Sequence, residues 1–332
     1  MLPVGTVLFT SRAGIGKTAI LSRKGCTNQG FQSIVPHKDE LDSYFIFSRT
    51  EELKRYGESV GSGSTFAEVS GKQMANMELM MPKTLVEQKT IGQYFASIDN
   101  LITLHQRKYD KLTKVKKSML EKMFPKNGAN VPEIRFKGFS DAWEQRKLGE
   151  MGQTYTGLSG KTKDDFGHGQ ARFVTYMNVF SNPISNPEMT EPIEIDPKQN
   201  EVEVGDVFFT TSSETPEEVG MSSILLEKRG KTYLNSFCFG FRPSEKIDSY
   251  YLAYMLRSES AREKITLLAQ GISRYNISKN KVMEIAVSLP SLDEQKMIGQ
   301  YFSQLDNLIT LHQRELEKLK NIKKACLEKM FV

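Results

Sequence analysis

The most regular hydrophobic pattern in the chain occurs twice, over residues 87–124 and 294–331. In both segments mostly apolar residues recur at alternating steps of four and three, with polar residues between them, except that one stripe position is a lysine (Lys116 in the first copy). This spacing gathers the apolar side chains into one stripe along a helix, which is typical of a coiled-coil seam. The stripe consists of Ile91, Phe95, Ile98, Ile102, His105, Tyr109, Leu112, Met119 and Met123, and in the second segment of Ile298, Phe302, Leu305, Ile309, His312, Leu316, Leu319, Cys326 and Met330.

These two segments are copies of one another. They align without a gap at an offset of 207 residues, and 26 of the 38 positions are identical. A capping-box pattern, Thr84-x-x-Glu87 or Ser291-x-x-Glu294, precedes each copy and marks a helix start. Each predicted helix is about 55 Å long, which is more than the cover of one small core requires. We therefore predict two long spacer helices.

Weaker similarity extends upstream of each helix. The matching segments are 4–10 with 204–210, 42–44 with 248–250, and 63–70 with 271–278, and each set is followed by a short apolar strand ending in Pro82 or Pro290. The repeating unit is therefore a globular domain followed by a long helix.

The two globular parts are unequal in length. Residues 132–203 have no counterpart upstream of Val4. Either the chain begins inside an ancestral domain or the first unit evolved shorter, and we expect the former. The pattern between the helices predicts an α/β domain. It places strands near 208–210, 224–226, 237–241 and 286–289 and one helical stretch near 249–268. The predicted organisation is a partial domain (1–86), a helix (87–124), a linker (125–131), a complete domain (132–293) and a second helix (294–332).

Composition narrows the class of protein only slightly. Charged residues make up 26% of the chain and the net charge is +5, which is compatible with a polyanionic partner. Three separated cysteines (Cys26, Cys238 and Cys326) with no Cys-x-x-Cys pair argue against a disulfide framework or a zinc site. Neither a signal peptide nor an apolar run of ~18 residues is apparent, so we expect a cytoplasmic protein without a membrane segment.

The layout of two different globular domains on nearly identical helices resembles the specificity subunits of type I restriction–modification enzymes. The residues that carry the resemblance are 290–298 (PSLDEQKMI) with their copy at 82–91, supported by 143–149 (WEQRKLG) and 14–18 (GIGKT). The resemblance implies α/β target-recognition domains, each reading one half of a bipartite, asymmetric DNA site. It also implies that the two helices pack antiparallel as a coiled coil, hold the domains apart and dock two methyltransferase subunits.

By the same resemblance, this chain reads double-stranded DNA but is not an enzyme and holds no cofactor or metal. S-adenosylmethionine, ATP and Mg are expected on the partner subunits, which methylate adenine or restrict and translocate DNA. Pairing of the chain with itself would restore a second half-site. Partner contacts are expected on the repeated helices, at Gln88, Tyr94, Phe95, Gln295, Tyr301 and Phe302.

Polar loops are the candidate DNA-reading elements. Hydroxyl, amide and basic side chains beside glycines suit contacts to phosphates and base edges, and Asn and Arg pair bidentately with adenine and guanine. The predicted DNA-binding residues are Ser64, Thr65, Thr154, Tyr155, Thr156, Ser159, Lys161, Lys163, Thr175, Tyr176, Asn178, Thr210, Thr211, Ser212, Ser273, Arg274, Tyr275 and Asn276. The competing interpretation is that these are ordinary turns.

Two other functions remain open at this stage. A helical scaffold or remnant would bind methyltransferase subunits without reading a full site. A P-loop NTPase is suggested by residues 11–18 (SRAGIGKT), although Ser11 stands where a P-loop has Gly or Ala and the following residues favour a strand over the required helix. His105 and His312 occupy matching seam positions, where structural pairing is favoured over catalysis.

Overall fold

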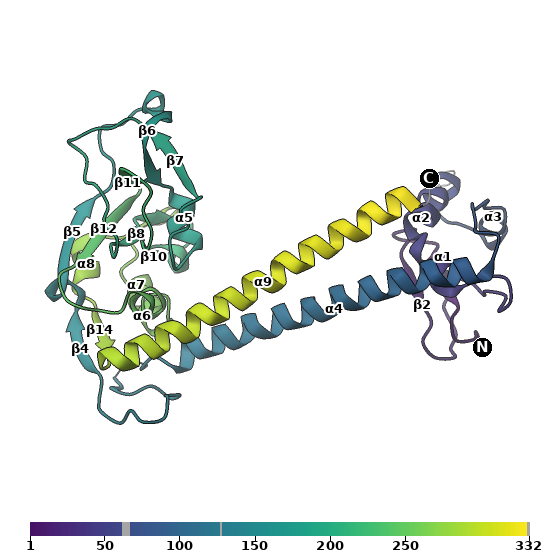
Figure 1. The fold of residues 1–332 in the computed structure, drawn as a ribbon, viewed down its shortest axis with the longest axis horizontal. Helices are drawn as coiled ribbons and strands as arrows, with labels where there is room; N and C mark the ends of the chain where they lie inside the picture. The colour runs from purple at the N-terminus through teal and green to yellow at the C-terminus, as the bar shows by residue number, and fades with distance from the viewer. Residues whose placement is uncertain (62–66, 127, 331–332) are drawn as a thin grey trace. The chain divides into compact units, whose positions relative to one another are not determined.

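The computed structural model describes residues 1–61, 67–126 and 128–330, which form two compact units. Unit 1 comprises Met1–Asp110 with Thr310–Val332, and unit 2 comprises Lys111–Ile309. Both contain helix and sheet, as predicted (Figure 1). Each long helix contributes residues to both units, so the helices are parts of the two folds as well as connections.

Unit 1 is built on a three-stranded antiparallel sheet. Its order is β2 (Thr18–Ile20), β1 (Val7–Thr10), β3 (Phe31–Ile34). The helices are α1 (Ser43–Ser48), α2 (Thr50–Gly61) and α3 (Gly71–Ala75). The small core consists of Val7, Phe9, Phe45, Ile46, Leu53 and Val69, with Ile91 of the first long helix packed against it.

Unit 2 contains a larger set of sheets. The main sheet has the order β10 (Ser222–Ile224), β8 (Val207–Thr210), β12 (Cys238–Pro243), β5 (Gly152–Thr156). A second sheet is ordered β11 (Thr232–Leu234), β6 (Phe166–Val174), β7 (Thr190–Ile193). Two short pairs are β13 (Tyr275–Asn276) with β9 (Ser212–Ser213) and β14 (Ala286–Leu289) with β4 (Glu144–Lys147).

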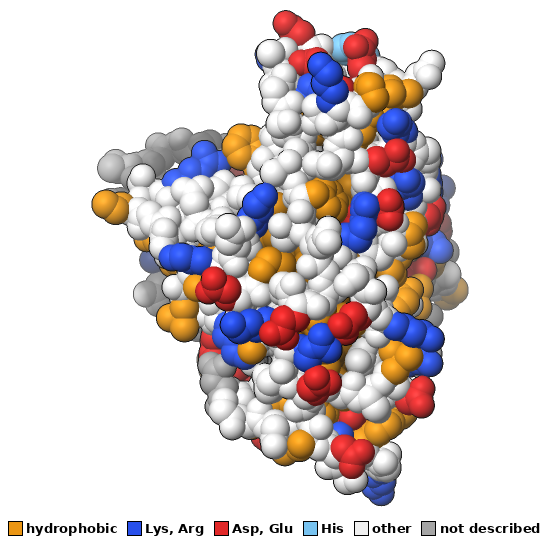
Figure 2. Space-filling view, turned by 90° about the vertical axis from the view of Figure 1, so that its left-hand side faces the viewer, with side chains coloured by type: hydrophobic (Ala, Val, Ile, Leu, Met, Phe, Trp, Pro, Cys, Tyr) orange, Lys and Arg blue, Asp and Glu red, His pale blue; other side chains and the backbone are white. Residues whose placement is uncertain are grey.

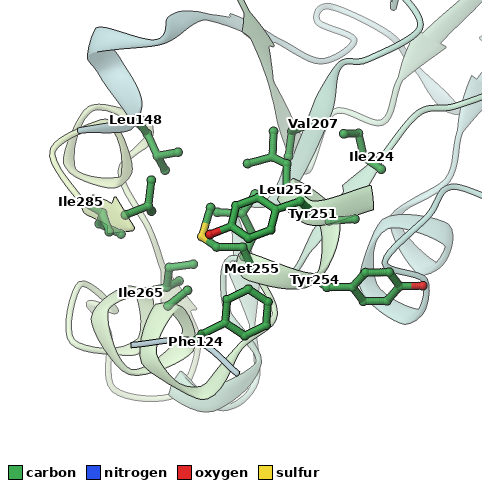
Figure 3. Packing of buried hydrophobic residues seen from close by; sticks show 14 of the residues in the cluster. Phe124, Leu148, Val207, Ile224, Tyr251, Leu252, Tyr254, Met255, Ile265 and Ile285 are labelled. Carbon is green, nitrogen blue, oxygen red and sulfur yellow. The ribbon is translucent and has the colours of Figure 1, made fainter. Parts of the chain in front are cut away.

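Short helices cover these sheets. They are α5 (Tyr176–Ser181), α6 (Ser249–Met255), α7 (Glu259–Thr266) and α8 (Lys279–Met283), together with 3₁₀ turns η1 (Leu148–Glu150), η2 (Lys163–Asp165) and η3 (Pro216–Glu218). Helix α6 lies at the centre of the core, where Leu252 and Met255 lie among Leu148, Ile265 and Ile285 (Figure 3). This core fixes the sheets whose ends carry the candidate site.

The two long helices, α4 (Leu85–Lys122) and α9 (Leu292–Met330), run antiparallel (Figure 1). In unit 1, Lys323 contacts Asp99 at 2.6 Å. In unit 2, Lys116 contacts Asp306 at 2.5 Å. Because each residue of the first pair is the repeat equivalent of one in the second, the same ion pair is made twice. The predicted antiparallel pairing is confirmed.

Both long helices begin two residues earlier than predicted, at Leu85 and Leu292. The side chain of Thr84 accepts a hydrogen bond from the Glu87 backbone at 3.2 Å, and Ser291 accepts one from Glu294 at 3.4 Å. The Glu294 carboxylate, however, binds Arg135. In a capping box the Glu294 side chain would accept a hydrogen bond from the Ser291 amide. Here it forms an ion pair with Arg135 instead.

The upstream repeat is also visible in the fold. Strands β1 and β8 each occupy the middle of three antiparallel strands, with Val7 opposite Ile20 and Val207 opposite Ile224. Helices α1 and α6 both begin at an aspartate N-cap, Asp42 or Asp248. The repeat therefore covers sheet, helix and spacer.

Several local predictions were wrong. The segment before Pro82 forms no strand, whereas β14 before Pro290 does, because β14 pairs with β4 and the described part of unit 1 contains no equivalent of β4. The stretch 249–268 is two helices, since the Ser258 side chain caps a new start. Strand β12 begins at Cys238 and not at Phe237, because the Phe237 amide donates to the Asn235 side chain.

Candidate nucleic-acid interface

Three loops of unit 2 meet at one end of its main sheet, and we call them the recognition edge: 211–213, 235–237 and 271–276. The amide and the hydroxyl of Thr211 both donate to the Phe237 carbonyl at 2.9 Å, and the Ile277 amide donates to the Thr211 carbonyl at 2.9 Å. Strand pairing joins Tyr275 to Ser213. Predicted residues that lie more than sixty positions apart in the sequence are thus brought together.

The loop 271–276 is closed at its base. Gln270 and Asn276 exchange two backbone hydrogen bonds of 2.9 and 2.8 Å. Gly271 has φ +150°, and a Cβ there would lie 2.0 Å from the Arg274 carbonyl oxygen. Only glycine therefore fits this turn, which presents Ser273 and Arg274 to solvent.

Helix α5 supports the recognition edge from inside. The Tyr176 hydroxyl donates to the Ser212 carbonyl at 2.7 Å, and Thr175 caps the helix by accepting from the Asn178 amide. Asn178 is fully buried, and its amide nitrogen donates to the carbonyls of Asn186 and Met189. These three predicted residues hold loops in place, so we leave them out of the DNA-contacting set.

The predicted residues of β5 and the following loop divide into exposed and internal ones. Thr156, Ser159 and Lys163 are exposed, while Thr154 is half-buried. The Tyr155 hydroxyl donates to the buried Asp206 at 2.5 Å, and burial, reinforced by that carboxylate, raises the pKa of Tyr155. Tyr155 therefore serves the fold.

Lysine 161 is engaged in an ion pair. Its amino group lies 2.9 Å from Asp196, whose carboxylate raises the pKa of Lys161. The same loop is tied down through Ser159, whose amide donates to the Gln199 side chain at 3.0 Å. The neighbouring Gly157 amide donates to the Cys238 carbonyl, which places this loop next to the recognition edge. The predicted residues Thr210 and Ser212 are buried.

Most basic side chains of unit 2 are neutralised or internal. Arg146 pairs with Glu245, and Arg242 pairs with Asp206, each at 2.8 Å. Burial lowers the pKa of Arg262 to about 10, and its guanidinium donates to backbone carbonyls. The face shown in Figure 2 accordingly intermixes basic and acidic side chains and carries no single positive patch. Exposed Arg274, by contrast, forms no ion pair with a carboxylate of the described residues.

Sequence reasoning missed two apolar residues of the recognition edge. Ile272 is 96% exposed and Phe237 is 55% exposed. The Arg274 guanidinium lies over the Phe237 ring, 5.9 Å from its centroid. The sequence shows that Ile272 follows a glycine and that Phe237 follows turn-forming residues. Apolar residues, however, are ordinarily assigned to the core.

Unit 1 presents a different loop at the corresponding place. The segment after β1 turns into β2, which pairs with β1 from Phe9 opposite Thr18. No helix therefore follows Lys17 to present its N-terminus, and the P-loop interpretation fails. The backbone of Lys17 instead donates to the Thr10 hydroxyl at 2.9 Å. The predicted residues Ser64 and Thr65 lie outside the described residues.

The predicted partner-binding residues are mostly internal. The Gln88 side chain accepts from the Asp42 amide at 3.1 Å, and the Gln295 side chain accepts from the Asp248 amide at 3.0 Å. Phe95 and its repeat equivalent Phe302 are fully buried, and Tyr301 is half-buried. Only Tyr94 retains substantial exposure, and its hydroxyl lies 3.4 Å from the Cys326 sulfur. The residues predicted for docking therefore serve mainly to seat each helix on its own domain.

Two absences concern the described residues only. No helix in residues 1–61, 67–126 and 128–330 is long and apolar enough to cross a membrane. Over the same ranges, no group of three or more histidine, cysteine, aspartate or glutamate side chains is placed to hold a metal ion.

Comparison with known proteins defines the class to which this fold and its loops belong. The family model described as the type I restriction modification DNA specificity domain matches residues 1–114 and 140–321, which is most of the chain. The chain therefore belongs to this family of DNA sequence-specificity subunits.

Individual relatives agree with that assignment. The MjaVIII type I specificity subunit of Methanocaldococcus jannaschii is 24% identical over 323 residues, covering 92% of this chain and 73% of the relative. The MjaIX subunit of the same organism is 31% identical over 175 residues, covering 49% and 39%.

Solved structures show the same fold. The type I S subunit from M. genitalium has a TM-score of 0.62 at 15% identity, with 100% of this chain and 84% of that chain covered. The subunit from Thermoanaerobacter tengcongensis has a TM-score of 0.51 at 18% identity, with 99% and 81% covered.

Proposed function

We propose that this specificity subunit reads one half of its DNA target through the recognition edge of unit 2, and that partner subunits carry all the chemistry. The observation that supports this proposal most is the convergence of 211–213, 235–237 and 271–276 on one clamped surface. Arginine and asparagine, the residue types of Arg274 and Asn276, are side chains suited to reading base edges in the major groove. Both are exposed at this surface.

We propose Thr211, Ser273, Arg274 and Asn276 as the principal DNA contacts. Thr156, Ser159 and Lys163 on the adjoining loop are proposed to contact phosphates, since they are exposed and Lys163 forms no ion pair among the described residues. Phosphate contacts fix the register of a protein on DNA, whereas base contacts specify the sequence.

Partner methyltransferase subunits are proposed to dock on exposed apolar positions of the repeated helices. Leu101 and Leu104 are 45% and 47% exposed, and their copies Leu308 and Leu311 are 44% and 52% exposed. All four lie within a stretch of nine identical residues in the two copies, 99–107 and 306–314. A burial requirement does not explain exposed leucines, but two like partners binding two like faces would.

A methylation map tests the reading proposal. The subunit is co-expressed with its methyltransferase partner, and modified adenines are mapped across the host genome. Arg274→Gln is compared with Lys246→Gln, which removes an exposed charge beyond the opposite end of β12. A bidentate arginine contact contributes about 1–3 kcal/mol of discrimination, so Arg274→Gln should relax one motif position or abolish modification.

The symmetry of the motif answers a second question. Two different half-sites would mean that unit 1 also reads DNA, whereas identical inverted halves would mean that two chains pair and read through unit 2. If Arg274→Gln leaves the motif and its modification level unchanged, the recognition edge is not the reading surface. Co-purification of the partner without any motif would favour the scaffold function.

A further inference from the structure

The recognition edge carries more exposed apolar surface than hydrogen bonding to DNA requires. Ile272 is almost completely solvent-exposed at the tip of the 271–276 loop, and Phe237 protrudes from the neighbouring turn. Exposing a large aliphatic side chain so fully gives up the stabilisation that its burial would contribute. Its placement among polar reading residues therefore points to a ligand surface.

Both side chains stand on backbone that is held in place. The Phe237 amide donates to the Asn235 side chain at 2.9 Å, and its carbonyl accepts from both donors of Thr211. Ile272 follows Gly271, whose left-handed backbone excludes any side chain, in a loop whose base is closed by two hydrogen bonds. Little ordering of these apolar groups is needed when a ligand binds.

Arg274 lies beside this apolar surface. Its guanidinium lies over the Phe237 ring, 5.9 Å from the centroid, and has no carboxylate partner among the described residues. A guanidinium with no carboxylate partner leaves its planar fork of donors available to pair with guanine O6 and N7. The base next to that guanine would then face the apolar side chains.

We propose that Ile272 and Phe237 form an apolar reading element that contacts the C5 methyl group of thymine in the major groove, next to the base pair read by Arg274. The thymine methyl is the only apolar group that a base pair presents in that groove. This inference rests on the proposed function, because it requires unit 2 to bind DNA through the recognition edge.

Replacing thymine by deoxyuridine tests it, since the change removes only the methyl group. The subunit with its methyltransferase partner is titrated with duplexes of the mapped target, in which each thymine of one half-site is replaced in turn. Loss of one buried methyl contact should weaken binding about fourfold at one position. With Ile272→Ala or Phe237→Ala, DNA that contains thymine at every position should bind more weakly. The loss of affinity caused by deoxyuridine at the contacted position should then fall to within about 1.5-fold.

The matched control is Val204→Ala. Val204 is an exposed apolar residue in the turn before β8, at the opposite end of that strand from Thr211, and its replacement should keep the full deoxyuridine penalty. Both reading-element variants alter exposed side chains, so unit 2 should stay folded.

The outcomes separate the two proposals. Failure of the complex to bind the mapped site, or binding unaffected by Arg274→Gln, would remove the proposed function. Two outcomes would overturn only the apolar reading element while binding still depends on Arg274. One is the absence of any deoxyuridine penalty, and the other is a penalty in both alanine variants equal to that of the unsubstituted subunit. Increased fluorescence of 2-aminopurine beside the site, without a deoxyuridine penalty, would also overturn it by indicating unstacking of a base step.

Discussion

The ion pair between Arg135 and Glu294 gives the most direct test of how α9 is attached to unit 2. Glu294 is 1% exposed, and its two carboxylate oxygens accept hydrogen bonds of 2.7 and 2.8 Å from the Arg135 guanidinium. Replacing the arginine by methionine keeps most of the apolar contact area but leaves a buried carboxylate without its counter-charge. Such a change costs about 3–5 kcal/mol. Because the Arg135 side chain is itself 15% exposed, we expect the lower end, about 3 kcal/mol.

Trp143 makes this measurable for unit 2 alone. It is the single tryptophan of the chain, it is 3% exposed, and its ring packs edge-on against Phe124 and Tyr251. Its fluorescence therefore reports the unfolding of this core in urea. With a slope of about 2 kcal/mol per molar urea, Arg135→Met should lower the midpoint by about 1.5 M.

The repeat supplies a matched control for this experiment. Glu87 is the equivalent of Glu294 in the first copy, but it is exposed and lies in unit 1. Glu87→Gln should therefore change the stability of unit 1, followed by circular dichroism, by less than about 0.5 kcal/mol. Adding Glu294→Gln to Arg135→Met should recover part of the loss, because it removes the unpaired charge. A loss below about 1 kcal/mol for Arg135→Met, or no recovery in the double variant, would refute the reasoning.

Two further predictions concern the recognition edge and the helix seam. Gly271→Ala places a methyl group against the Arg274 carbonyl in a left-handed turn. DNA affinity, measured by fluorescence anisotropy, should therefore fall at least about tenfold. The Trp143 transition should shift by about 1 kcal/mol or less. The His312 ring lies 3.0 Å from His105, and burial, followed by the charges of His105 and Lys108, lowers the pKa of His312. The folded state therefore disfavours the protonated form: stability is intact above the ordinary histidine pKa of about 6.5 and is lost as the pH falls below it. Melting followed by circular dichroism should show a smaller difference between pH 7.5 and 5.5 in His312→Gln, and an unchanged difference would contradict the assignment.

The long helices and the repeat were predictable from the sequence, because an apolar pattern with a period of 3.5 residues indicates both a helix and the face that it buries. The missing strand before Pro82 was not predictable, since a strand needs a partner. The similarity of two segments says nothing about whether β4 exists to pair with both of them. Residue type likewise could not separate Asn178, whose amide is used up inside, from Asn276, which is exposed.

The candidate site shows the same division. The sequence singled out the loop around Arg274 as a candidate DNA-reading loop, because glycine, hydroxyl and basic residues are concentrated there. It could not indicate that this loop lies against 211–213 and 235–237, which depends on long-range backbone pairing. It also assigned no role to Ile272, since an aliphatic residue in a sequence is ordinarily counted towards the core.

We attribute the identity of the two helix copies to two physical causes, one internal and one external. Gln88 and Gln295 are identical because each accepts the amide of an aspartate N-cap in its own unit, and the aspartates at 99 and 306 each pair with a lysine. These contacts attach each helix to its own domain and to the other helix. They do not explain the leucines at 101, 104, 308 and 311, which are exposed in both copies. Because about half of each of these side chains is exposed in both copies, we propose that an external partner maintains this duplicated face. Charged replacements of these leucines should therefore release the partner subunit while leaving thermal unfolding, followed by circular dichroism, unchanged. Loss of folding together with docking would show instead that the leucines serve the helix pair.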